Sequence, residues 1–219
     1  MRIYYIRHGE TPWNRDFFLQ GRTNISLNEN GRASAVLTGK GLSGVRFDLC
    51  VTSPLDRAME TAELILRQNS RELPGAEPAL WPAGTVTERN GVRFFTDARL
   101  IEYCFGVWEG LCYKGPGKTL PIASYSDFWA ELNEAERPEG SEAFTDFFAR
   151  VTEFLNELDA RFGQSEMNIL VVAHGAVSRG IRHVLCGDAT SMKNCEAQII
   201  EKTADGLAIT GRQDFSAGV

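Results

Sequence analysis

Two hydropathy patterns alternate along this chain. Short, continuous apolar runs bounded by Gly or polar residues are typical of strands buried on both faces of a sheet. Such runs occupy 3–6, 47–52 and 169–173. Apolar positions three and four residues apart predict helices instead. That spacing covers 28–42, 55–66, 144–162 and 176–186. The alternation predicts an α/β fold: a three-layer sandwich with a largely parallel central sheet flanked by helices.

Turn and capping residues mark several element ends. Ser53 and Pro54 stand directly before the helix over 55–66, where they would serve as an N-cap and a first-turn proline. Two turn-favouring dipeptides each predict a hairpin. The hairpins cover 85–96, around Asn90-Gly91, and 198–210, around Asp205-Gly206.

Two segments lack a clear period. Residues 10–27 are polar and irregular, which is typical of a functional loop. Residues 104–138, here named the cap region, contain Gly115-Pro116-Gly117 and one predicted short helix over 126–136. Because no linker or repeat divides the chain, we expect a single domain over 1–219 in which the cap region lies over the strand ends.

Composition narrows the function classes. The chain has 219 residues, of which 43% are hydrophobic, and a formal net charge of −6. This charge disfavours a nucleic-acid or anionic-membrane partner. No apolar run approaches the roughly 20 residues of a membrane span, and no secretory signal is recognisable. We therefore expect a cytoplasmic protein, and the sequence does not indicate its oligomeric state.

The cysteines and histidines predict neither a disulfide frame nor a metal site. The cysteines are odd in number, scattered and never in a C-x-x-C pair, so they fit buried free thiols. They are Cys50, Cys104, Cys112, Cys186 and Cys195. No two histidines have metal-ligand spacing, and we expect no metal and no cofactor.

Two of the three histidines stand where a predicted strand ends. Each begins a His-Gly pair, at His8 and at His174. Ligands of open α/β sheets bind beyond the carboxyl ends of the strands, and Arg7 stands at the same end. Arg57 lies in the first turn of the helix that follows the strand over 47–52. The alternative for each residue alone is a surface ion pair or a core histidine. Together they predict a cationic pocket for a compact polyanion such as phosphate.

Four motifs in series carry a family resemblance. They are Arg7-His8-Gly9-Glu10-Thr11-x-Trp13-Asn14 with Gln20-Gly21; Thr52-Ser53-Pro54-Leu55-x-Arg57-Ala58-x-Glu60-Thr61-Ala62; Leu100-x-Glu102-x-x-x-Gly106-x-Trp108-Glu109-Gly110; and Ala173-His174-Gly175. Pro138-Glu139-Gly140-Ser141-Glu142 precedes the long helix. In this order the chain closely resembles the histidine phosphatase superfamily, in its phosphoglycerate-mutase-like branch.

The resemblance implies that His8 attacks phosphorus and forms a phosphohistidine. A neutral imidazole nitrogen is a competent nucleophile near neutral pH, which agrees with this role. The resemblance also implies a catalytic and phosphate-binding set around it. This set is Arg7, Asn14, Gln20, Gly21, Arg57, His174 and Gly175. For Asn14 the alternative is a loop residue that caps its own backbone.

The family's Leu-x-Glu pattern implies that Glu102 is the general acid, with a pKa raised by burial. Glu109 is the rival, although the family pattern puts it in a structural Trp-Glu-Gly turn. On the helix after His174, we expect His183 to pack on the surface. Arg179 and Arg182 either extend the cationic field or are solvated or ion-paired, and the latter is our expectation.

A hydrolase and a mutase need the same pocket. After Gln20-Gly21 the chain lacks the Trp-x-Asp expected of a cofactor-dependent mutase, and the segment 102–110 is closer to phosphatase members. We therefore predict a phosphomonoester hydrolase acting on a small phosphorylated metabolite, with a mutase as the alternative. A non-catalytic phosphate-binding relative is expected to lack one of the two histidines or arginines, and all are present. The cap aromatics either stack on the substrate or pack, and we expect packing. They are Tyr103, Tyr113, Tyr125, Phe128 and Trp129.

Overall fold

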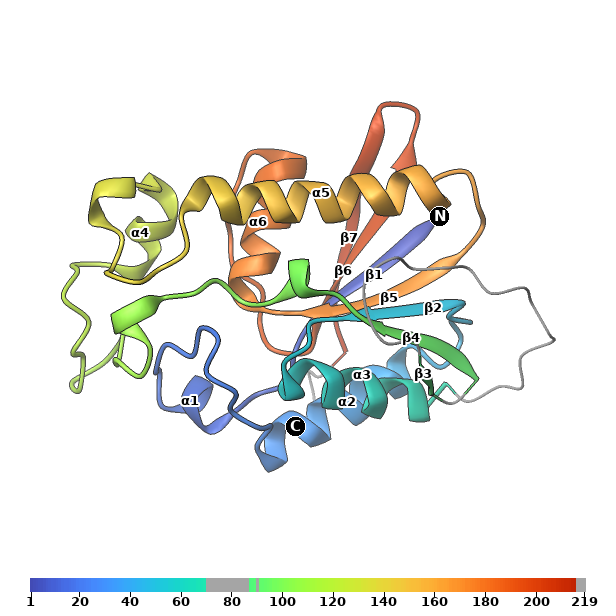
Figure 1. The fold of residues 1–219 in the computed structure, drawn as a ribbon. Coiled ribbons are helices and arrows are strands. Elements are labelled where there is room, and N and C mark those ends of the chain that lie inside the picture. The colour runs from blue at the N-terminus through green and yellow to red at the C-terminus, as the bar shows by residue number, and fades with distance from the viewer. Residues whose placement is uncertain (70–86, 90, 216–219) are drawn as a thin grey trace.

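The computed structural model describes residues 1–69, 87–89 and 91–215, and their strands form one sheet in the order β3-β4-β2-β5-β1-β6-β7 (Figure 1). The strands are β1 Arg2–Arg7, β2 Leu49–Thr52, β3 Thr87–Arg89, β4 Val92–Thr96, β5 Asn168–Ala173, β6 Glu196–Thr203 and β7 Gly206–Asp214. The central strands β4, β2, β5 and β1 are parallel, whereas β3, β6 and β7 pair antiparallel with their neighbours. The predicted parallel centre is confirmed, and the two hairpins supply the antiparallel edges.

Helices cover both faces of the sheet (Figure 1). They are α1 Pro12–Arg15, α2 Glu29–Gly41, α3 Asp56–Arg67, α4 Tyr125–Glu131, α5 Phe144–Phe162 and α6 Gly175–Cys186, with short 3-10 turns at Ala98–Leu100, Gly106–Trp108 and Glu134–Glu136. Helices α2 and α3 lie together on one face, and α5 and α6 lie on the other (Figure 1). The three-layer α/β sandwich predicted from the sequence is therefore confirmed.

The interiors of the central strands β1, β2 and β5 are apolar because both faces of the sheet are covered there. In β1, Tyr5 belongs to the buried cluster that includes the α5 residues, whereas the next residue, Ile6, belongs to the cluster on the α3 side. The stripe of α5 predicted as core is buried at Phe147, Phe154 and Phe162. Burial of a side chain of this size stabilises the folded protein by about 1.5–3 kcal/mol.

Strand register brings distant segments to one edge. Arg7 pairs with Ala173 and Thr52 pairs with Val172 in the parallel ladders. The residues that follow continue the pattern, because the His8 N–H donates to the Ala173 carbonyl at 2.9 Å. His8, Ser53 and His174 therefore leave the sheet side by side at the carboxyl ends of the strands.

The start of α3 differs from the expectation. The helix begins at Asp56 with Leu55 as its N-cap residue, so Ser53 is not the N-cap and Pro54 is outside the first turn. The Ser53 hydroxyl instead accepts a hydrogen bond from the Leu55 N–H at 3.3 Å and contacts the His174 ring. A hydroxyl committed to that local turn and to a histidine is no longer available to cap the helix.

The less regular segments also contain more structure than expected. The loop over 10–27 includes the short helix α1, which a capping box between Thr11 and Asn14 starts. The helix expected over 126–136 is two elements. Helix α4 ends at Glu131, its C-cap residue Leu132 has a left-handed φ of 49°, and a 3-10 turn follows. The left-handed residue breaks the helical hydrogen-bond ladder. The cap region lies at one end of the sheet, beside α1 (Figure 1).

Both hairpins are present. Strands β3 and β4 pair from Thr87↔Phe94 to Arg89↔Val92, while residues 85, 86 and 90 of the predicted hairpin lie outside the described residues. The C-terminal hairpin is longer than expected, because β6 and β7 pair from Glu196↔Asp214 to Thr203↔Gly206. Among the described helices, none combines the length and the apolar character needed to cross a membrane.

Candidate active site

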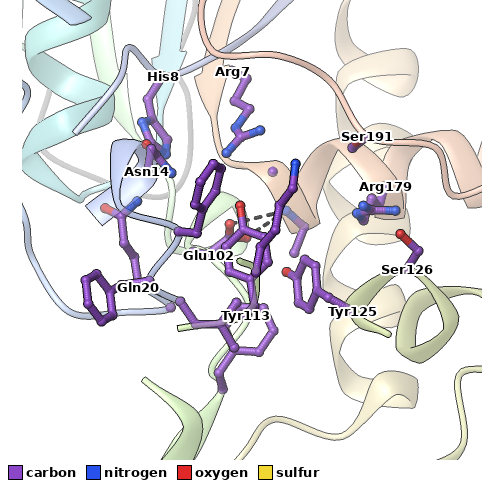
Figure 2. Close-up of a pocket in the computed structure, with 18 of the residues that line it drawn as sticks. Arg7, His8, Asn14, Gln20, Glu102, Tyr113, Tyr125, Ser126, Arg179 and Ser191 are labelled. Carbon is purple, nitrogen blue, oxygen red and sulfur yellow. Dashed lines mark hydrogen bonds between the residues drawn. The ribbon is translucent and has the colours of Figure 1, made fainter. Parts of the chain in front are cut away.

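A cavity of about 530 Å³ lies at the carboxyl edge of the parallel strands (Figure 2). Its walls come from β1, the loop over 10–27, the start of α3, the cap region and the start of α6. Nearly all of the predicted site residues line it. These are Arg7, His8, Asn14, Gln20, Gly21, Arg57, Glu102 and Gly175. His174 is the exception: it is fully buried behind the wall and touches the site through the His8 ring.

The nucleophile candidate His8 has a defined protonation pattern. Its Nδ1 lies 2.7 Å from the Gly9 carbonyl oxygen, which only accepts, so Nδ1 carries the proton and Nε2 keeps its lone pair. Burial lowers the pKa of His8 well below its usual value, and the charges of Arg57 and Arg7 lower it further. A neutral ring with a free Nε2 is the form that can attack phosphorus.

The second histidine supports the first. His174 is the N-cap residue of α6, and its ring centroid lies 5.2 Å from that of His8. Its Nε2 is 2.6 Å from the Ser53 hydroxyl oxygen. Burial, followed by the charge of Arg57, lowers the pKa of His174 well below its usual value, so this ring is also neutral near pH 7.

Backbone carbonyls hold both guanidinium groups in place. Arg57 donates to the Thr23 carbonyl at 2.9 Å and to the Gly21 carbonyl at 2.8 Å, and Arg7 donates to the Met192 carbonyl at 2.6 Å. Burial lowers the pKa of Arg57 to about 10, so it remains a cation at neutral pH. A carbonyl orients a guanidinium without neutralising it, and both charges therefore remain available to a phosphoryl group.

The acid candidate Glu102 is buried, and its carboxylate lies against the first turn of α6. Its carboxylate accepts hydrogen bonds from the Tyr103 N–H at 2.9 Å and from the Ala176 N–H at 3.1 Å, the second of which Figure 2 shows as a dashed line. Burial raises the pKa of Glu102, although these backbone donors partly oppose the shift. A raised pKa favours the protonated form that a general acid requires.

The rival carboxylate, Glu109, does not line the cavity. It accepts hydrogen bonds from the backbone of Arg22 and Thr23, each at 3.0 Å, and from the Thr23 hydroxyl at 2.7 Å. A Cβ at Gly21 would collide with this carboxylate, and the φ of Gly21 is +49°, which favours glycine. Glu109 therefore shapes the loop that positions Arg57, as the structural interpretation predicted.

Asn14 caps its own backbone and also lies in the wall of the cavity. Its Oδ1 accepts from the Thr11 N–H at 3.2 Å in the capping box, and the residue also lines the cavity. Since Oδ1 is occupied, the amide group that remains to meet a ligand is the NH₂. Gln20 lines the same wall, and its buried Oε1 has no hydrogen-bond partner within the described part of the chain.

Three contributors escaped the sequence analysis. Asn194 donates to the His8 carbonyl at 2.8 Å and to the Gly9 carbonyl at 3.3 Å, and no local motif marks it. Ser53 contacts His174 and was assigned to helix capping instead. Arg179 was expected to be solvated or ion-paired but lines the cavity. Helical periodicity could have indicated this position: Arg179 follows the cavity residues Ala176 and Gly175 by three and four positions, so it lies on the same face of α6.

The remaining candidates behave more simply. Arg182 pairs with Asp188, and His183 packs on the Phe148 ring at 4.5 Å, as expected. The cysteines are free thiols, but Cys186 is exposed and Cys104 half-buried rather than buried, since both lie near the ends of surface elements. Of the cap aromatics, three are buried and two line the cavity. The buried ones are Tyr103, Phe128 and Trp129, and the lining ones are Tyr113 and Tyr125.

Comparison with known proteins identifies the family. The model of the histidine phosphatase superfamily (branch 1) matches residues 3–82 and 77–214. The chain belongs to this superfamily. The match includes both His-Gly pairs, both arginines and Glu102, so the residues that form the cavity lie within the family's own region.

Relatives within the superfamily carry two kinds of activity in their names. The chain is 32% identical over 179 residues to the adenosylcobalamin/alpha-ribazole phosphatase of Escherichia coli, covering 81% of this chain and 75% of that protein. It is 29% identical over 198 residues to a 2,3-bisphosphoglycerate-dependent phosphoglycerate mutase of Gloeobacter violaceus, covering 84% and 83%. A crystal structure assigned to the alpha-ribazole-5′-P phosphatase of Escherichia coli matches with a TM-score of 0.73 and 26% identity, covering 100% and 98%. The protein is thus a phosphatase or mutase of this superfamily.

Proposed function

We propose that the protein is a phosphomonoester hydrolase that acts on a small phosphorylated metabolite through a phosphohistidine intermediate. The observation that carries this proposal is the state of His8. Its Nδ1 proton is committed to the Gly9 carbonyl, and its neutral ring lines a cavity that also holds Arg7 and Arg57. Nucleophile and charge stabilisation therefore occur together, which is what phosphoryl transfer requires.

In the first step, His8 Nε2 attacks phosphorus in line with the leaving oxygen. The N–P bond forms while the ester P–O bond breaks, and protonated Glu102 donates its proton to the departing alkoxide. Arg7, Arg57 and the Asn14 amide stabilise the charge that spreads over the phosphoryl oxygens. Loss of one such donor typically costs on the order of 10²–10³ in rate.

In the second step, water replaces the released alcohol. The Glu102 carboxylate now removes a proton from this water, the new O–P bond forms and the N–P bond breaks. Inorganic phosphate leaves, His8 recovers its neutral ring, and Glu102 is protonated again. One carboxyl group thus serves as acid and then as base, so the proton balance closes over the cycle.

A mutase is the second candidate, since the mutase relative aligns over most of both chains. A mutase would return the phosphoryl group to a second hydroxyl of the substrate instead of to water. Two departures from the mutase pattern support the hydrolase. The chain lacks Trp-x-Asp after Gln20-Gly21, and its segment 102–110 is closer to the phosphatase members of the family.

The deciding experiment compares two reactions of one preparation. Phosphate release from p-nitrophenyl phosphate is measured beside the interconversion of 3- and 2-phosphoglycerate. We expect release without interconversion, and an acid-labile phosphoryl label on the protein that the His8→Ala variant lacks. Interconversion with negligible release would establish the mutase, whereas neither reaction and no label would indicate a non-catalytic phosphate-binding relative.

The proposed chemistry uses guanidinium groups where other phosphatases use metal ions. Arg7 and Arg57 supply the positive charge, and the nucleophile is an imidazole that needs no metal to activate it. Treatment with EDTA followed by gel filtration is therefore expected to leave the rate of phosphate release unchanged. A loss of rate that added divalent metal restores would contradict this.

The composition of the chain and its free cysteine thiols support a cytoplasmic location for this activity.

A further inference from the structure

The cavity holds more positive charge than one phosphoryl group needs. Four cationic side chains line it, namely Arg7, Arg57, Lys114 and Arg179, and Glu102 is the only carboxylate among the described lining residues. A phosphomonoester carries close to two negative charges at neutral pH. Arg7 and Arg57 balance these charges, so Lys114 and Arg179 remain. This local excess occurs in a chain whose formal net charge is −6.

Arg179 lies across the cavity from the nucleophile and has partners of its own. Figure 2 shows its guanidinium beside Ser126 and Ser191, on the opposite side of the cavity from His8. Its guanidinium carbon lies 5.7 Å from the Trp129 ring centroid and 6.0 Å from that of Tyr125, and it donates to the Ala189 carbonyl. The two ring contacts and the carbonyl restrict the positions that the guanidinium can take, which favours the binding of an anion there.

The charge of Arg179 is not neutralised by the protein. Within the described part of the chain, no carboxylate lies within ion-pair distance of it, whereas Arg182 on the same helix pairs with Asp188. Burial is the main cause that lowers the pKa of Arg179, which reflects a partly desolvated cation. Proteins rarely keep such a charge without a partner, so a ligand is the natural source of the missing anion.

We propose that Arg179 forms a second anion-binding subsite, and that the substrate is a phosphomonoester with a carboxylate or second phosphate at its far end. The side chains of Ser126 and Ser191 supply further donors on this side of the cavity, and Lys114 adds a second cation to its lining. The inference rests on the proposed hydrolase function and specifies its substrate class. The alternative is a structural role, in which Arg179 only clamps Tyr125 and Trp129 of α4.

Matched substrates separate these roles. The probes are alkyl phosphates, ω-carboxyalkyl phosphates and alkanediol bisphosphates with chains of three to six carbons, which differ only in the far end and its reach. For the wild type we expect kcat/KM at least 10-fold higher for the best anionic member than for the alkyl phosphate of equal length. Comparison of the carboxylates with the bisphosphates identifies which anion the subsite prefers.

The variants test the residue itself. We expect Arg179→Gln to lower this preference about 10- to 100-fold, mainly through KM, since a charge-assisted hydrogen bond is lost. Arg182→Gln, on the same helix but paired with Asp188, is the control and should keep the preference. A structural role predicts that Arg179→Gln slows all substrates equally. That result, or no preference in the wild type, would overturn the proposal.

A binding measurement keeps the inference separate from the reaction. Alkylphosphonates and ω-carboxyalkylphosphonates are not hydrolysed, so calorimetry reports their affinities whether or not the protein is a hydrolase. Tighter binding of the carboxylates that depends on Arg179 supports the subsite. Equal binding of the two series contradicts it. Failure to release phosphate from every ester, with the binding preference intact, would count against the hydrolase alone.

Discussion

His8 and Glu102 line one cavity, yet burial moves their pKa values in opposite directions. The pKa of His8 falls and that of Glu102 rises, because burial disfavours the charged form of each group. The same desolvation thus favours the neutral imidazole of the nucleophile and the protonated carboxyl of the acid. At the residue scale, low solvent access is the largest cause of both shifts, and the charges of Arg57 and Arg7 add to the shift of His8.

The role of Glu102 is testable through the leaving group. We expect Glu102→Gln to lower the rate of alkyl phosphate hydrolysis about 10²–10⁴-fold, the usual contribution of a general acid. The phosphorylation of His8 by p-nitrophenyl phosphate should suffer much less, because p-nitrophenolate leaves without a proton. Burst kinetics with the two esters measures this step directly. Equal losses with both esters would show that Glu102 does not protonate the leaving oxygen.

Asn194 offers a second residue-scale test, as a positioning residue. Its amide donates to the carbonyls of His8 and Gly9, and the Gly9 carbonyl also accepts from His8 Nδ1. In Asn194→Asp a carboxylate would replace these donors and place a negative charge beside His8. We expect a lower kcat and an acid limb of the kcat/KM profile moved to higher pH. Asn194→Ala should lower kcat without that pH shift. An unmoved limb in Asn194→Asp would contradict the electrostatic argument.

At the element scale, α5 and α6 form one unit behind the site. The Phe147 ring of α5 lies so close to Gly180 of α6 that a Cβ on Gly180 would be 3.0 Å from the ring. This packing fixes the position of α6, and the Ala176 N–H in its first turn donates a hydrogen bond to the Glu102 carboxylate. Local pattern predicted these helices and the central strands well, because periodicity and buried faces are local properties. It failed at the start of α3, where Ser53 is engaged by a turn and by His174.

The packing of α5 predicts a large loss of stability from one truncation. Phe147 is fully buried, so Phe147→Ala should lower the free energy of unfolding by about 3–5 kcal/mol through lost burial and a cavity. Phe148, the next residue, is half-buried and serves as the control. Urea unfolding of both variants checks this. Equal losses would mean that the α5–α6 contact does not depend on the inward-facing ring.

At the scale of the whole molecule, the buried histidines connect the site to folding. His8 and His174 have folded-state pKa values below the ordinary value of 6.5. Below pH 6.5 the unfolded chain therefore binds more protons than the folded protein. Their contribution to stability is fully present above pH 6.5 and is lost as the pH falls below it. The pKa of Glu102 is raised above 4.5 in the folded protein, so Glu102 changes the pH dependence of stability in the opposite direction. It is one group, however, against two histidines.

We therefore expect the free energy of unfolding to fall between pH 7 and pH 5.5. Each buried histidine contributes a slope of at most about 1.4 kcal/mol per pH unit. The double variant His8→Asn and His174→Asn should show a flatter profile, while His183→Asn, outside the cavity, serves as the control. Urea midpoints across this range provide the measurement. A wild-type profile as flat as that of the double variant would contradict the argument.

The sequence by itself determined which segments become strands and helices and which residues stand at their ends, because hydropathy and turn chemistry act over a few positions. It placed His8 and His174 after strands and Arg57 in a first helical turn. The family resemblance implied different places for Glu102 and Glu109, but only the tertiary structure decided that register sets Arg7 opposite Ala173 and that Glu109 holds the backbone of Arg22 and Thr23. The same holds for the contacts of Asn194 with the His8 and Gly9 carbonyls. Such roles depend on contacts between segments far apart in the chain, which no local pattern encodes.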